Sequence, residues 1–139
     1  MSPIPINLPA LLVVAVLQVV LGFVWYSPVL FGNTWARAMG KSEAEARAAM
    51  KEGALWATIV SFVGALVMAF VLRHAVASAG ATSIALGMVV GFWSWLGFIA
   101  VVMVNAVMYE RRPWPLFFVN AGFYLVALLI AGAILAVYV

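Results

Sequence analysis

Charge is scarce in this sequence. Only 8% of its 139 residues are Asp, Glu, Lys or Arg, whereas 68% are hydrophobic, and soluble domains carry roughly a quarter charged residues. Water cannot solvate a surface of that composition, so the chain is expected to lie in a lipid bilayer. Cysteine is absent, which excludes disulfides, thiolate metal sites and cysteine nucleophiles. The single histidine, His74, is expected in a loop beside Arg73 and is a poor haem or pigment ligand.

Long apolar segments remain when the chain is cut at its charges and prolines. A spanning helix needs about 20 mainly apolar residues, and these segments are continuous rather than alternating, which argues against a barrel. The sequence therefore predicts an all-α, four-transmembrane-helix bundle that forms a single domain over residues 1–139. The expected spans are residues 8–26, 53–72, 83–108 and 116–139.

The connection between the first two spans is the only long one. Ser42 and Glu45 have the spacing of a capping box, which marks a helix start. Glu43 and Arg47 follow at i, i+4 spacing, with alanines on another side. This pattern predicts a short amphipathic helix on the membrane surface. Gly40 is expected to end a shorter helix before it.

Basic residues predict the orientation of the spans. The second connection holds Arg73 alone, whereas the first and third hold Arg37, Lys41, Arg47, Lys51, Arg111 and Arg112. The positive-inside rule therefore places the first and third connections in the cytoplasm, with both termini and the Arg73 turn outside. An interfacial aromatic belt is expected at the cytoplasmic ends, formed by Trp25, Tyr26, Trp35, Tyr109 and Trp114.

Small residues recur every four positions in the middle spans, and such stripes let helix backbones approach closely in lipid. The stripes are Ala57, Ser61, Ala65 and Ala69 in the second span, and Ser83, Gly87 and Gly91 in the third. Gln18, near the middle of the first span, is expected to bond across to another helix. A monomeric bundle and a bundle that also self-associates are equally compatible with these patterns.

Polar side chains are few, and each is a candidate site because polar groups are costly in lipid. Asn105 and Asn120 are expected at similar depth, either bonded to each other as a clamp, which we favour, or lining a polar pocket. Glu110 is expected to be neutralised by the adjacent arginines or to pair with Arg37. The candidate interfacial cluster is Trp25, Tyr26, Ser27, Asn105, Tyr109, Glu110, Arg111 and Asn120.

These residues do not make a reaction centre. No catalytic residue, cofactor or metal site is predicted, because a base, a nucleophile and a metal-ligand set are all lacking. The chain is therefore expected not to be an enzyme, and its loop charges do not predict nucleic-acid binding. We expect a non-catalytic multi-pass membrane protein that self-associates or serves as an accessory subunit, with membrane lipids and a homo-oligomer or larger membrane complex as partners. The alternative is a small oligomeric transporter or channel for a small solute.

Two stretches give the sequence a family resemblance. They are residues 22–32, GFVWYSPVLFG, and residues 110–117, ERRPWPLF, the latter followed by NAGF at residues 120–123. Together they resemble the signature of an uncharacterised bacterial integral-membrane family, domain of unknown function 1761, over essentially the whole chain. The resemblance implies four spans in a bacterial inner membrane and no established activity, substrate or cofactor. Any function is expected at the rim where the turn at residues 25–32 faces the turn at residues 110–115.

Overall fold

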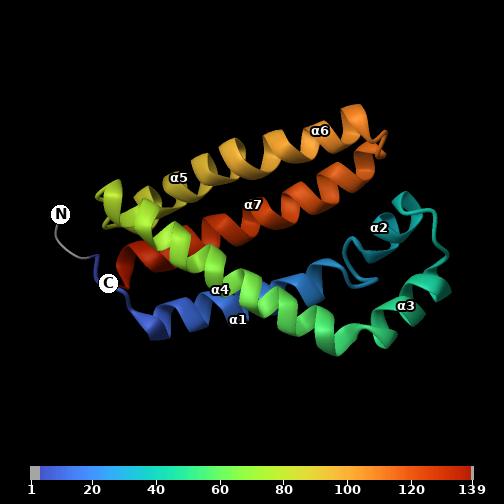
Figure 1. Ribbon diagram of the computed structural model, residues 1–139, viewed down its shortest axis with the longest axis horizontal. Helices are drawn as coiled ribbons and strands as arrows, with labels where there is room; N and C mark the ends of the chain where they lie inside the picture. The colour runs from blue at the N-terminus through green and yellow to red at the C-terminus, as the bar shows by residue number, and fades with distance from the viewer. Residues whose placement is uncertain (1–3, 139) are drawn as a thin grey trace.

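Four long helical segments dominate the computed structural model, which describes residues 4–138 (Figure 1). Each is long and apolar enough to cross a membrane, with a mean hydropathy of 2.0 to 2.5 over its most apolar window. The chain is therefore an all-helical membrane protein, as predicted. The four segments are α1 (Leu8–Trp25), α4 (Ala54–Ser78), Ile84–Tyr109 and α7 (Trp114–Val137). Val139, the last residue of the expected fourth span, lies outside the described residues.

The third segment is not one uniform α-helix. It consists of α5 (Ile84–Trp95), a π-helical turn η1 (Leu96–Ala100) and α6 (Val101–Tyr109). A π-helix is wider than an α-helix, because its backbone hydrogen bonds span five residues instead of four. The π turn therefore changes which side chains of α6 face the rest of the bundle.

Two short helices fill the first connection, α2 (Gly32–Ala38) and α3 (Glu43–Glu52). The predicted amphipathic helix is α3, and its capping box is formed: the Glu45 amide donates to Ser42 Oγ at 3.2 Å, and the Ser42 amide donates to Glu45 Oε2 at 2.9 Å. Gly40, with a φ of 70°, follows α2 in the left-handed conformation that glycine favours.

α7 lies at the centre of the bundle, between α5 on one side and α1 with α4 on the other (Figure 1). It carries the largest buried share of the four spans. Apolar side chains of α1, α4 and α7 form the core, which includes Leu11, Val14, Leu72, Val76, Leu128 and Leu135. Because α5 has α7 as its main neighbour, the opposite side of α5, η1 and α6 is open.

Glycines set the close contact between α5 and α7. A Cβ added to Gly91 would overlap the Leu128 carbonyl and lie 2.8 Å from its carbon, and one added to Gly87 would overlap the backbone of Gly132. The backbones of the two helices therefore touch directly. Gly87 and Gly91 of the small-residue stripe expected in the third span lie at this contact, whereas Ser83 is exposed and caps the start of α5.

The second span is longer than predicted, because α4 continues to Ser78 instead of ending at residue 72. The expectation that Arg73 lies in a turn was wrong. Arg73 is on the helix, is only 4% exposed, and donates from Nε to the Pro5 carbonyl at 3.2 Å and from Nη1 to the Leu135 carbonyl at 3.1 Å. Leu135 belongs to the last turn of α7, where unpaired carbonyls carry partial negative charge. Backbone carbonyls thus stabilise a cation that sequence patterning assigned to water.

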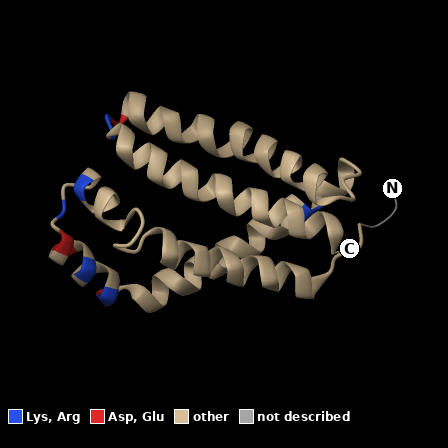
Figure 2. Cartoon of the chain, turned by 180° about the vertical axis from the view of Figure 1, so that it is seen from behind, with Lys and Arg blue, Asp and Glu red and all other residues tan. Residues whose placement is uncertain are grey.

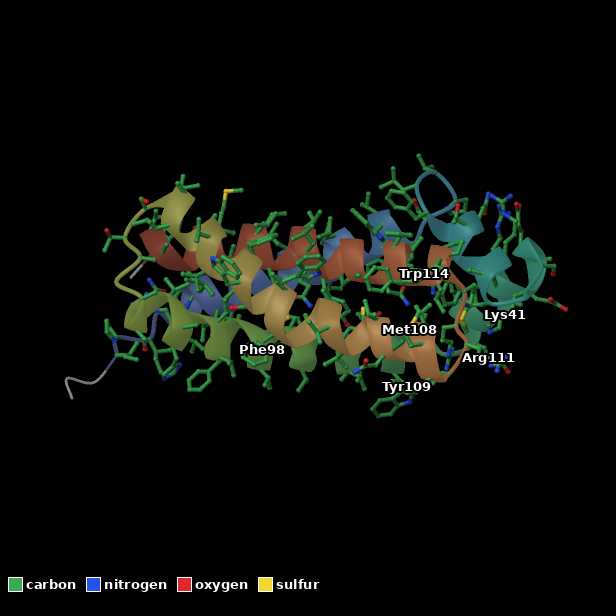
Figure 3. All side chains as sticks on the ribbon, turned by 90° about the horizontal axis from the view of Figure 1, so that it is seen from above. Lys41, Phe98, Met108, Tyr109, Arg111 and Trp114 are labelled. Carbon is green, nitrogen blue, oxygen red and sulfur yellow. The ribbon has the colours of Figure 1, made fainter. Side chains whose placement is uncertain are left out.

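The other charged side chains gather at the opposite end of the bundle from Arg73, on α2, α3 and the turn before α7 (Figure 2). The start of α1 and the end of α7 lie at the Arg73 end (Figure 1). Lys41, Tyr109 and Trp114 lie near the charged end, whereas Phe98 lies nearer the middle of its span (Figure 3). The described chain therefore has one charged, aromatic end and one nearly uncharged end.

Candidate functional site

The structure divides the predicted interfacial cluster into two groups. Trp25 and Tyr26, at the end of α1, contact Asn120 and its neighbours on α7. Asn105 and Tyr109, on α6, are exposed on the outside of the bundle. The cluster is therefore not one site, and each group has its own surroundings.

The first group joins α1 to α7 through two hydrogen bonds. The Tyr26 hydroxyl donates to Asn120 Oδ1 at 2.8 Å, and the Trp25 indole Nε1 donates to the Val119 carbonyl at 2.9 Å. A Cβ added to Gly122 would lie 3.2 Å from the Trp25 ring, so a small residue there lets the indole approach α7. A phenol is protonated at neutral pH, so the Tyr26 hydroxyl is available as the donor in this bond.

These contacts show through which residues the two family-like stretches meet. Residues 22–32 contact residues 119–123 of α7, which include the NAGF part of the second stretch. The Tyr26 ring also lies edge-on to Trp35, with ring centroids 6.1 Å apart, and packs near Phe123 at 5.6 Å. The group is thus a cluster of packed aromatic rings in which the Trp25 indole and the Tyr26 hydroxyl are both hydrogen-bonded. It holds α2 against α7.

The second group lacks the partners that the sequence predicted. Asn120 is bonded to Tyr26, and Asn105 is exposed, so the favoured Asn105–Asn120 clamp was wrong. Tyr109 is 85% exposed and points away from the bundle (Figure 3). Ser27, the remaining hydroxyl of the cluster, donates to the Val24 carbonyl at 2.7 Å and closes the end of α1.

The acidic turn is a local surface pair. Glu110 Oε2 accepts from Arg112 Nε at 3.2 Å, and both side chains are about half exposed. Arg37 instead donates from Nε to the Asn33 carbonyl at 3.3 Å, so the suggested Glu110–Arg37 pair was wrong. Arg111 occupies the turn with a φ of 54°. An exposed pair of this kind contributes at most about 1 kcal/mol and carries no chemistry.

The π turn explains why Asn105 points outward. Gly87 and Asn105 are 18 residues apart, which is five turns of an ideal α-helix, so both would face α7 if the span were uniform. The extra residue in η1 rotates α6 by about 100° relative to α5. Val107 faces inward as a result, and Asn105 does not. The exposed side of η1 and α6, which we call the outer face, consists of Phe98, Val101, Val102, Asn105, Met108 and Tyr109.

A cavity of about 890 Å³ lies between α1, α3, α4 and α7, toward the charged end, and we call it the lateral cavity. The small residues expected to pack the second span differ in burial. Ala65 and Ala69 are buried, whereas Ala57 and Ser61 are exposed in the cavity wall. Its other walls include Gln18, Phe23, Tyr26, Trp35, Met50, Gly64 and Tyr124.

Gln18 is the residue of α1 in the cavity wall that lies farthest from the charged end, and it is polar. Its Oε1 is buried and has no hydrogen-bond partner among the residues described, so the interhelical bond expected for Gln18 is not formed. Sequence reasoning missed the cavity because a run of small residues on α4 is typical of helix packing. Only the divergence of α1 from α4, a tertiary feature, leaves these small residues without a neighbour.

The arrangement can donate and accept hydrogen bonds but offers no acid–base pair. Within residues 4–138, no group of three or more His, Cys, Asp or Glu side chains is placed to hold a metal ion. His74, on α4, directs Nδ1 to the Phe70 carbonyl at 2.8 Å. The sites of interest are therefore the outer face and the lateral cavity, both suited to binding.

Comparison with known proteins identifies the family to which this chain belongs. No curated protein and no solved structure matches the chain. One family model, described as protein of unknown function (DUF1761), matches residues 9–136, from the first turn of α1 to the last turn of α7. The chain therefore belongs to the DUF1761 family, as the resemblance predicted.

Proposed function

We propose that this chain is a non-catalytic membrane protein that pairs with a second copy of itself through the outer face. The observation that supports this is Asn105, a polar side chain exposed on an otherwise apolar side of α6. Hydrocarbon offers an amide no hydrogen-bond partner, so contact with another helix is favourable. The π turn directs this amide away from α7, and π turns occur frequently at functional sites.

A second copy is the partner that fits the chemistry best. A carboxamide carries both donors and an acceptor, so two Asn105 side chains related by a two-fold axis can bond reciprocally. Copies in one bilayer share an orientation, so the axis runs along the membrane normal and each residue meets its counterpart at the same depth. Val102 would then face the partner's Val102, one turn from the amide pair.

Cysteine cross-linking tests the pairing, because the chain has no native cysteine. Val102→Cys should form disulfide-linked dimers under mild oxidation in native membranes, since symmetric pairing brings the Cα atoms within about 7 Å. Val63→Cys is the matched control, since Val63 is similarly exposed but lies on α4. An interhelical amide bond in lipid contributes about 1–2 kcal/mol, so adding Asn105→Leu should weaken dimerisation about 5- to 30-fold. Equal cross-linking at positions 102 and 63, or no effect of Asn105→Leu, would refute the proposal.

We further propose a bacterial inner membrane as the location, with the charged end in the cytoplasm and the two ends of the chain on the outside. The segregation of basic residues to one end of the bundle supports this orientation (Figure 2). The test is a reporter enzyme that is active only in the periplasm, fused to the end of the chain. This fusion should be active. A cytoplasmic signal from that fusion contradicts the orientation.

A second candidate function is a small oligomeric transporter or channel for a small solute, and the lateral cavity is the observation that favours it. Among the described residues that line the cavity, none is Asp, Glu, Lys or Arg, so a neutral solute fits better than an ion. Glycerol flux in liposomes should then be abolished by Gly64→Leu, which fills the cavity. An absence of flux in the unmodified protein eliminates this candidate.

A further inference from the structure

The lateral cavity has the size and extent of a ligand site. Its volume of about 890 Å³ lies within the range of roughly 300–1,000 Å³ typical of small-molecule pockets. Along α4 its wall extends from Gly53 to Met68, which at 1.5 Å per residue is about 22 Å. The space is therefore elongated and runs parallel to the spans, from the charged end toward the middle of the membrane.

The cavity opens toward lipid. Phe23 and Val60 line it, yet both side chains are more than half exposed on the outside of the bundle. A molecule can therefore enter from the bilayer, between α1 and α4, without crossing the charged connection. Inside the cavity such a molecule contacts apolar side chains and the small residues Ala57, Gly64 and Ala65.

The chemistry of the lining selects among lipids. With no charged side chain in the described lining, a carboxylate or phosphate inside the cavity would have no counter-ion, and its desolvation would oppose binding. Gln18 contributes an amide whose Oε1 is buried and unpaired among the residues described. In this conformation Oε1 is closed off from the cavity, and a half-turn of the amide about its terminal torsion exposes the oxygen to a ligand. A ligand that supplies a hydrogen-bond donor there removes the cost of the unpaired buried acceptor. A hydroxyl group does so and is uncharged, and Ser61 and Tyr124 offer further hydroxyls along the wall.

From these observations we infer that the lateral cavity binds a neutral lipid whose polar end carries a hydroxyl group, of the fatty-alcohol or monoacylglycerol class. The hydroxyl hydrogen-bonds the Gln18 amide, and the hydrocarbon chain lies along the small residues of α4. The inference is independent of self-association, because no residue of the outer face lines this cavity.

Photo-crosslinking tests the inference on the full chain in phosphatidylcholine vesicles. The probe is a monoacylglycerol with a diazirine in its acyl chain, and mass spectrometry of the digested protein locates the labelled residues. Labelling should concentrate on residues 57–64 and 46–50, and oleyl alcohol should compete better than oleic acid or octadecene. Labelling spread evenly over every lipid-facing helix, or equal competition by all three compounds, would overturn the inference.

Two glycines provide a matched pair of variants. A Cβ added to Gly64, in the cavity wall, or to Gly97, in η1, meets nothing within 4 Å. Gly64→Leu should abolish the labelling of residues 57–64, whereas Gly97→Leu should leave it unchanged. Gly53→Leu fills the same cavity from its edge and replaces Gly64→Leu if that variant loses its helical circular dichroism. Equal labelling of the filled and control variants overturns the inference.

Gln18→Leu tests the hydroxyl contact separately from the shape of the cavity. This variant should still bind the hydrocarbon chain of the probe. Its preference for oleyl alcohol over octadecene as competitor should fall by about 5- to 10-fold, which corresponds to one hydrogen bond. A retained preference would show that Gln18 does not read the ligand. Cross-linking at Val102→Cys should be unchanged in the Gly64→Leu variant, so failure of the dimer proposal and failure of this inference are distinguishable.

Discussion

The contact between α5 and α7 should be highly sensitive to a single methyl group. A Cβ on residue 91 would lie 2.8 Å from the Leu128 carbonyl carbon, whereas carbon atoms in contact are about 3.5–4.0 Å apart. Gly91→Ala therefore forces the two helices apart locally by about 1 Å, which removes a quarter to a half of the dispersion energy of the affected contacts. Overpacking of this kind costs about 1–3 kcal/mol, and the helix propensity of alanine offsets up to about 1 kcal/mol.

The expected net loss is about 1 kcal/mol, a roughly 5-fold increase in the unfolding constant. The assay is unfolding in mixed micelles by titration with a denaturing detergent, followed by circular dichroism. Gly97→Ala is the control in the same span, since its added Cβ meets nothing within 4 Å. The control should be neutral or more stable by about 0.5–1 kcal/mol. If Gly91→Ala is as stable as Gly97→Ala, the direct backbone contact between α5 and α7 is refuted.

Two further predictions concern charged groups. Arg73→Met should lower the free energy of unfolding by about 1–3 kcal/mol, because the Leu135 and Pro5 carbonyls lose a charged donor. Arg73→Lys should recover part of this loss in the same detergent titration. The capping box lowers the pKa of Glu45, chiefly through the Ser42 backbone amide and then its side chain. Its stabilisation of α3 is therefore complete above the unfolded-state pKa and is lost as the pH falls through the lowered pKa. Protection of the first-turn amides of α3 against hydrogen exchange, relative to the intrinsic exchange rate at each pH, should fall in that acidic window. Ser42→Ala should lower this protection already at neutral pH; protection independent of both changes contradicts the capping box.

The fold was predictable because its signals are local. Long apolar runs predict spans, since lipid requires every backbone hydrogen bond to be made within a helix. Ser42 with Glu45, and Gly40, predict the short helices because caps and left-handed glycines act within a few residues. The end of α4 was not predictable, because Arg73 is stabilised by carbonyls from segments far away in the sequence.

The candidate site was predictable only in part. The sequence placed Tyr26 and Asn120 in the same candidate cluster but favoured a bond between Asn105 and Asn120, whereas Asn120 accepts from Tyr26. That error has a geometric origin, since an ideal helix would place Asn105 on the side of Gly87, and no residue type predicts the π turn between them. The lateral cavity depends on how far α1 and α4 diverge, which no local pattern encodes.

The buried arginine also has a consequence for how the protein is made. The Pro5 carbonyl is synthesised before Arg73, but Leu135 follows Arg73 by 62 residues. At about 5–20 residues per second the guanidinium therefore waits roughly 3–12 s for the second of its two acceptors. During that interval Arg73 has to reach water at the membrane edge, as long basic side chains do. Insertion of the second span is therefore provisional until the last turn of the fourth span arrives and fastens it.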